Sequence, residues 1–179
     1  MERRVIVHGR PRRAVGAVRS LPAPARVDPA DPFVALMGAW FDATLPPARW
    51  AVVAGSGADA EAALDAAAAA KELLVVRTGI ADADARLVDL APVLGRLLDD
   101  MTPSQRRLAM LLLVDGRRQA DAAEILGISR ASVSVAHGRA RIHEVGLLLR
   151  ATRASWAAGL AAWPSPDGPS LTGSATVPR

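Results

Sequence analysis

Hydrophobic positions follow two different periods in the first hundred residues. Short apolar, β-branched runs predict three strands, at residues 4–8, 50–54 and 73–76. Apolar residues at helical spacing predict three helices, one that begins at Asp31-Pro32, one over 58–72 and one over 82–100. The alternation of strands and helices indicates a small α/β unit at residues 31–80, followed by a connecting helix at 81–101.

From residue 102 onward the periodicity is helical throughout. Thr102-Pro103-Ser104-Gln105 carries the capping-box pattern, with proline at the first helical position. Gly116 is a predicted left-handed helix stop, and a second helix should follow at about 118–126. We expect that helix to bury Ala122, Ile125 and Leu126. A long last helix is expected at about 143–162.

The stretch Gly127-Ile128-Ser129 joins two of these helices and predicts a helix-turn-helix. Gly127 adopts positive φ at little cost, Ile128 should enter the core, and Ser129 can cap the next helix with its hydroxyl. In this motif the second helix enters the major groove of DNA. The motif therefore makes nucleic acid the first partner to consider.

The helix that begins at Arg130 has two contrasting faces. Val133, His137 and Ala140 share the face that we expect to turn inward. The opposite face is small, hydroxylic and basic, which allows close approach to a groove, with arginines to reach phosphates. The residues predicted to contact DNA are Arg117, Arg118, Gln119, Ser129, Arg130, Ala131, Ser132, Ser134, Val135, Arg139 and Arg141. The alternative is a helical hairpin that only packs.

Charge is distributed unevenly along the chain. Residues 1–26 carry seven arginines against one glutamate, residues 27–101 carry twelve acids against five bases, and residues 102–156 carry nine arginines against four acids. A basic, largely irregular arm at residues 1–30 and a basic helical domain at residues 102–162 both favour a polyanionic partner. Residues 163–179, rich in Pro, Ser and Gly, are expected to be a disordered tail.

The segment TPSQRRLAMLLLVDGRRQADAAEILGISRASVSVAHGRARI resembles region 4 of bacterial sigma factors and the related LuxR-type helix-turn-helix. The matching features are T-P-x-Q-R, G-x-x-Q-A, A-x-x-L-G-I-S and the R-A-R that follows. Over residues 50–158 the order of elements resembles the SatD family. That resemblance implies a small α/β domain joined by a leucine-rich helix to a C-terminal helix-turn-helix. No aromatic-rich, basic segment for promoter melting accompanies it, so a sigma factor is not expected.

The sequence gives only weak support for a phosphate site, a metal site or a catalytic site. Gly55-Ser56-Gly57 lies between a strand and a helix, as a phosphate site would, but G-x-G-x-x-G is incomplete and a plain turn is favoured. Asp82 is expected to cap a helix, and Asp99-Asp100 to be a solvated helix end, rather than metal ligands. The three histidines lack metal-ligand spacing and no catalytic triad can be assembled, so we expect no metal, no cofactor and no enzymatic activity.

Together these patterns predict an α+β chain that binds double-stranded DNA as a bacterial transcriptional regulator. The absence of cysteine, of a membrane-length apolar run and of a secretory signal fits the cytoplasm. Two alternatives stay open: a module that binds RNA polymerase or another regulator, and a degenerate ligand-sensing domain that holds a nucleotide. A homodimer through residues 145–163 is also expected, because Trp156 and Trp163 should leave excess apolar surface there.

Overall fold

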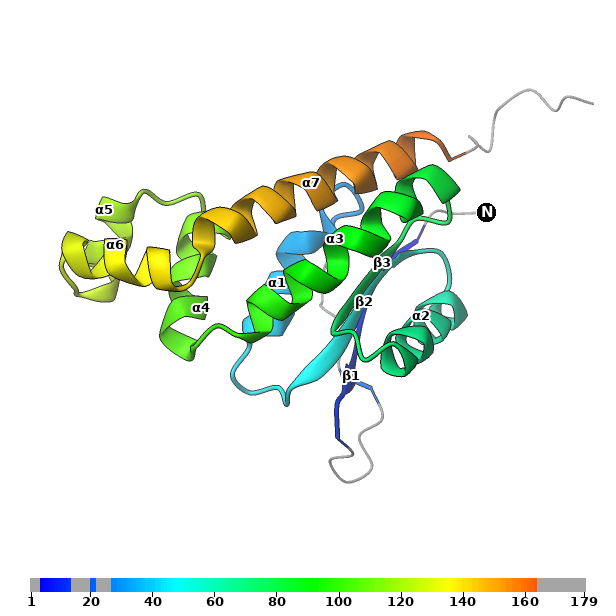
Figure 1. The fold of residues 1–179 in the computed structure, drawn as a ribbon, viewed down its shortest axis with the longest axis horizontal. Helices are drawn as coiled ribbons and strands as arrows, with labels where there is room; N and C mark the ends of the chain where they lie inside the picture. Colours follow the sequence, from blue (N-terminus) through cyan, green and yellow to red (C-terminus); the bar gives the residue numbers. More distant parts are fainter. Residues whose placement is uncertain (1–3, 14–19, 22–26, 164–179) are drawn as a thin grey trace, which may run out of the picture.

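A three-stranded sheet forms the centre of the first part of the molecule (Figure 1). The computed structural model describes residues 4–13, 20–21 and 27–163. Strand β2 (Ala48–Ala54) lies in the middle, antiparallel to β1 (Val5–Pro11) and parallel to β3 (Leu74–Arg77). The three predicted strands are therefore confirmed, with β1 longer than expected.

Helices cover both faces of this sheet (Figure 1). Helix α2 (Gly57–Ala69) packs on one face, where Leu64 meets the alternate β2 residues Ala51 and Val53. Helices α1 (Pro32–Phe41) and α3 (Ala81–Asp99) pack on the other face. Because both faces are covered, β2 is buried on both sides, as its continuous apolar run predicts.

The remaining described residues are helical. Helix α4 (Pro103–Ala109) leads into a π-helical turn, η1 (Met110–Val114), and helices α5 (Gln119–Leu126), α6 (Arg130–Arg139) and α7 (Ile142–Ala161) follow. Figure 1 shows α4, α5 and α6 grouped at one end, with α7 running from them back along α3. The chain is thus α+β, as predicted.

Helix α7 is held against the sheet unit by two tryptophans, Trp156 within it and Trp163 just after its end. Trp156 is fully buried, packs edge-on against Phe33 at 6.2 Å between ring centroids, and donates from Nε1 to the Pro29 carbonyl at 3.0 Å. Trp163 is half-buried and donates from Nε1 to the Thr78 carbonyl at 2.5 Å. The prediction that these two side chains form a free association face is wrong, because they close the intramolecular core. The homodimer stays a prediction without that basis.

A second contact joins α7 to the start of α1. Asp31 caps α1 by accepting from the Phe33 backbone N–H, and the Arg153 guanidinium binds the same carboxylate at 2.8 and 2.9 Å. Hydrophobic residues from the sheet unit, α3, α5, α6 and α7 belong to one continuous core cluster. The helix-turn-helix and the sheet unit therefore share their packing through α7 and α3.

The start of α3 differs from the sequence prediction. Asp82 is exposed and does not cap the helix; Ile80 precedes α3 and has no side-chain cap. Asp84 accepts instead, at 2.7 to 3.2 Å, from the backbone N–H groups of Thr78 and Gly79 and from the Thr78 hydroxyl. At the other end, Asp99 is ion-paired with Arg12 rather than only solvated.

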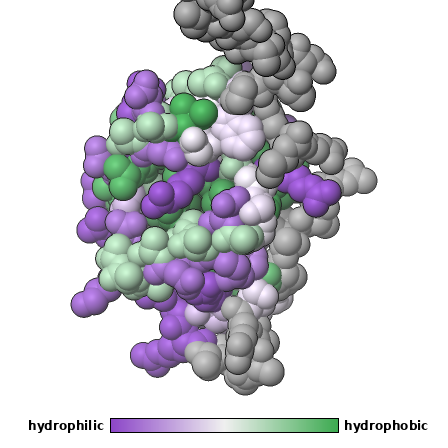
Figure 2. Space-filling model, turned by 90° about the vertical axis from the view of Figure 1, so that its right-hand side faces the viewer, coloured by the Kyte–Doolittle hydropathy of each residue, from purple (hydrophilic) through white to green (hydrophobic). Residues whose placement is uncertain are grey.

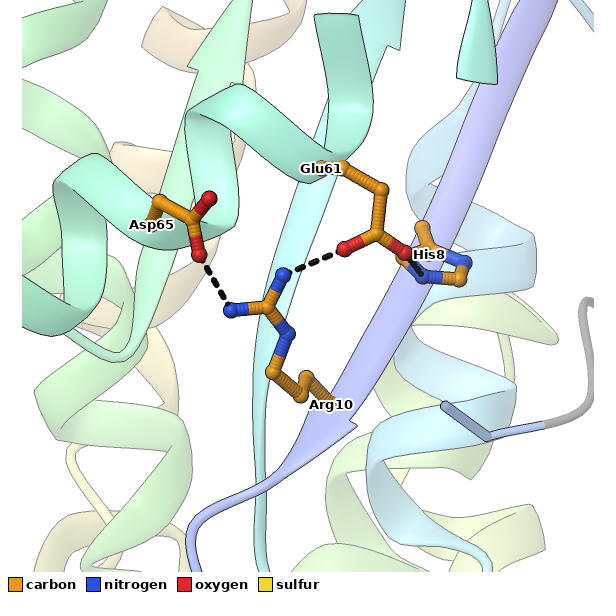
Figure 3. Close-up of polar contacts among 4 residues, drawn as sticks. All are labelled: His8, Arg10, Glu61 and Asp65. Atoms are coloured by element: carbon orange, nitrogen blue, oxygen red, sulfur yellow. Dashed lines mark hydrogen bonds and ion pairs between the residues drawn. The ribbon is translucent and has the colours of Figure 1, made fainter. Parts of the chain in front are cut away.

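A charged cluster ties α2 to β1 (Figure 3). Arg10 bridges the two α2 carboxylates Glu61 and Asp65, the latter at 2.5 Å, and His8 Nε2 lies 2.8 Å from Glu61. The hydrogen bond from Arg10, with a smaller one from His8, lowers the pKa of Glu61, while the same carboxylates raise the pKa of Arg10.

Figure 2 shows the face that lies on the right of Figure 1. In its described part, strongly hydrophobic spots are small and separated by hydrophilic side chains.

The predicted ends of the chain lie mostly outside the described residues. This applies to residues 1–3, 14–19 and 22–26 of the basic arm and to 164–179 of the tail. In the described part of the chain, no helix has both the length and the apolar character needed to cross a membrane.

Candidate nucleic-acid interface

The turn between α5 and α6 has the geometry that Gly127 was expected to allow. Gly127 has φ +66°, and the Ile128 backbone N–H donates to the Ala123 carbonyl at 3.0 Å, which closes the end of α5. A Cβ added at Gly127 would meet no heavy atom within 4 Å in the described structure. Glycine is therefore favoured here by backbone conformation and not by crowding.

Ser129 caps α6 as predicted. Its Oγ accepts from the Ser132 backbone N–H at 3.1 Å, and the two hydroxyls lie 2.9 Å apart. At the start of α5, the Asp121 carboxylate accepts from the Arg118 backbone N–H at 3.3 Å. Since the Ser129 and Ser132 hydroxyls already contact each other, we assign both residues first to the shape of the helix start.

The sequence prediction was wrong about two isoleucines at this turn. Ile125 is 49% exposed and Ile128 is 43% exposed, so the expectation that both are buried is wrong. The contact between α5 and its neighbours is made by the small residues Ala122 and Ala123, which are buried, with Leu126 half-buried. Alanines bring the helices close together and leave little room for a larger side chain between them.

Helix α6 has the two faces that its sequence predicts. Val133 and Ala140 are buried and His137 is half-buried, which fixes the inward side. At 100° per residue, Ala131 and Val135 lie on the opposite side, and Val135 is 54% exposed. The residues of α6 include Arg130 and Arg139 but no acidic residue. The exposed face is thus small and apolar at its centre, with arginines and serines at its edges.

All eleven residues predicted to contact DNA are exposed. Arg117, Arg118 and Gln119 lie at the start of α5, and the others lie in the turn, along α6 and at its end. Ser132, Val135 and Arg139 also line an open groove of about 610 Å³ between α6 and the start of α4. The sequence prediction missed that Thr102, Ser104 and Gln105 form the other wall of this groove, although their capping pattern had placed them at a helix start.

Arg141 occupies a strained position between α6 and α7. Its φ is +51°, in the left-handed region that favours glycine, and its Nε lies 3.4 Å from a Glu144 carboxylate oxygen. The Arg141 side chain is 60% exposed. Lys71 is the other described non-glycine residue with positive φ, so the strain at Arg141 does not by itself indicate a role in binding.

The other candidate sites have structural explanations. The Ser56 backbone N–H, which would face a phosphate, donates to the Asp59 carboxylate at 2.7 Å, and a Cβ at Gly55 would lie 2.7 Å from the same group. An anion there would meet a carboxylate already in place, which argues against the phosphate and nucleotide reading of Gly55-Ser56-Gly57. The described residues contain no group of three or more potential metal ligands.

No family model, curated protein or solved structure matches the chain. The resemblance to sigma region 4, the LuxR-type helix-turn-helix and the SatD family therefore stays an expectation from the sequence.

Proposed function

We propose that this chain binds double-stranded DNA in a sequence-specific way, with α6 in the major groove. The observation that carries the proposal is the exposed face of α6, which is small and apolar at its centre, flanked by arginines and free of acids, behind a glycine turn and a serine cap. We further propose that the protein is a transcriptional regulator in the bacterial cytoplasm.

The residues on this face suit distinct contacts in the proposed complex. Ala131 and Val135 can meet the C5-methyl groups of thymine, and Arg130, at the helix start, can reach a guanine edge. Arg139 and Arg141 lie farther along and suit phosphate oxygens, which position a protein without reading sequence. Arg117 and Arg118 add charge at the start of α5.

Selection of bound duplexes from a random library tests the proposal. We expect an enriched sequence motif, bound at least about 10³-fold more tightly than unrelated DNA. Arg86→Ala, which removes an exposed arginine of α3 outside the interface, is the matched control and should select the same motif. Absence of any enriched motif would contradict sequence-specific binding.

A protein-interaction module is the second candidate, and one observation favours it. Ile125 and Ile128 are large apolar side chains, 49% and 43% exposed, that lie next to the turn and within it, and Val135, 54% exposed, lies farther along α6. Exposed apolar side chains that gather in one region mark protein interfaces, and RNA polymerase or another regulator would be the partner. Ile128→Ser should abolish such a complex and leave DNA selection unchanged.

A further inference from the structure

A pocket of about 530 Å³ lies where the sheet unit meets α4. Its walls come from Arg12 just after β1, from the stretch that runs from the end of α1 to the start of β2, from the end of α3, and from α4 with the first residue of η1. A pocket of this size holds a small organic molecule. A ligand in it would contact the two parts of the molecule at once.

Aromatic side chains line part of the pocket. Trp40 and Trp50 stack with ring centroids 6.3 Å apart and 28° between their planes, and Phe41, which follows Trp40 in sequence, also lines the wall. The guanidinium carbon of Arg106 lies 5.9 Å from the centre of the Phe41 ring. Flat apolar walls of this kind favour a planar ring over a branched aliphatic ligand.

The charges around the pocket are unequal once their partners are counted. Three arginines and two acids line it, so it is net positive. Asp99 is paired with Arg12, while Asp42 stays charged and accepts from the Thr44 hydroxyl and backbone N–H at 2.7 and 2.8 Å. Among the described residues, Arg106 donates to the carbonyl oxygens of Met101 and Asp99, at 2.9 and 3.2 Å, and forms no ion pair with a carboxylate.

Two further donors face no acceptor. Arg107 is exposed and has no ion pair within the described part of the chain. The Arg12 Nε is buried and has no hydrogen-bond partner among the described residues. A buried donor without a partner is unfavourable, and a bound acceptor would relieve it.

We propose that this pocket binds a planar aromatic molecule that carries a single carboxylate. The ring lies against Trp40, Phe41 and Trp50, and the carboxylate pairs with the unneutralised arginines, Arg107 foremost. The proposal is independent of DNA binding, because it rests on residues outside the exposed face of α6.

Isothermal titration of the full chain with naphthalene-2-carboxylate tests the proposal. We expect saturable binding with one ligand per chain and a Kd of about 1 mM or tighter. Naphthalene-2-carboxamide, which has the same ring and no charge, should bind at least about tenfold more weakly. Fluorescence of the stacked tryptophans gives a second readout of the same event.

Two variants locate the binding site. Arg107→Gln removes the exposed charge and should weaken carboxylate binding at least about tenfold. Ala43→Trp places a large side chain from the exposed loop into the pocket and should block binding of both probes. Arg86→Gln, on α3 and outside the pocket, should leave binding unchanged, and melting temperatures show that each variant folds.

Three results would overturn the proposal. The carboxylate does not bind at millimolar concentration, the amide binds as tightly as the carboxylate, or neither Arg107→Gln nor Ala43→Trp weakens binding.

Discussion

Arg130 is the first residue of α6 and is exposed, which makes it the clearest test of base readout. Arg130→Ala should weaken binding to the selected duplex by roughly 1–3 kcal/mol and relax the preference at one base pair. Competition assays with single-base variants of the duplex measure both effects. Equal weakening on every sequence would assign Arg130 to a phosphate instead.

Replacing Arg141 should change protein stability and DNA affinity in opposite directions. Arg141→Gly removes the left-handed strain of a non-glycine residue, so the free energy of unfolding should rise by up to about 1 kcal/mol. The same change removes one exposed guanidinium, so DNA affinity should fall on all sequences and the salt slope should decrease by about 1. Thermal melting and anisotropy titrations at several salt concentrations measure the two effects. Unchanged DNA binding would remove Arg141 from the interface.

At the scale of elements, α7 packs very closely against Thr78, the residue that follows β3. A Cβ at Gly159 would lie 2.6 Å from the Thr78 Cγ2, and Thr78 is fully buried. Gly159→Ala should therefore destabilise the fold by about 1–3 kcal/mol through overpacking. Denaturant unfolding gives the value.

Gly38→Ala is the matched control for this substitution. An added Cβ at Gly38, on α1, meets no heavy atom within 4 Å in the described structure, so helix propensity should stabilise the protein by about 0.5–1 kcal/mol. Equal effects of the two substitutions would mean that α7 does not pack closely on Thr78.

The cluster that joins α2 to β1 predicts a pH dependence. Because Arg10 and His8 lower the pKa of Glu61 in the folded state, the stability from this carboxylate is present above its unfolded pKa and is lost as the pH falls through the lower, folded pKa. Wild type should exceed Glu61→Gln in melting temperature near neutral pH, and the difference should disappear in acid. Glu61 is about half exposed, so the effect should be below about 1 kcal/mol.

Arg10→Ala completes a double-mutant cycle for this cluster. In that background, Glu61→Gln should change the melting temperature much less. A pH-independent difference between wild type and Glu61→Gln would contradict the assigned role of the carboxylate.

At the scale of the whole molecule, local patterns predicted the elements and distant contacts decided the rest. The capping box at Thr102, the glycine turn at Gly127 and the cap at Ser129 act over a few residues, so the sequence alone was sufficient to predict them. The burial of Trp156 depends on Phe33 and Pro29, more than a hundred residues away, and no periodicity in α7 reveals it.

Surfaces formed by one short segment were predicted correctly, and surfaces that depend on contacts distant in sequence were not. The exposed face of α6 follows from helical spacing, because one short helix determines it. Ile128 was predicted to be buried because it is hydrophobic. In the structure Ala122 and Ala123 make the buried contact instead, and Ile128 stays exposed. The aromatic pocket was not predicted at all, since its walls come from stretches far apart in sequence, namely Arg12, residues 39–50 and residues 99–110.

The salt dependence of binding to a selected duplex tests the central claim, that α6 and its flanking arginines engage DNA. If three to five of the exposed arginines contact phosphates, log K should fall with log salt with a slope of roughly −3 to −5. Unrelated DNA should show a similar slope at much lower affinity. A slope near zero, or equal affinity for selected and unrelated DNA, would contradict the account.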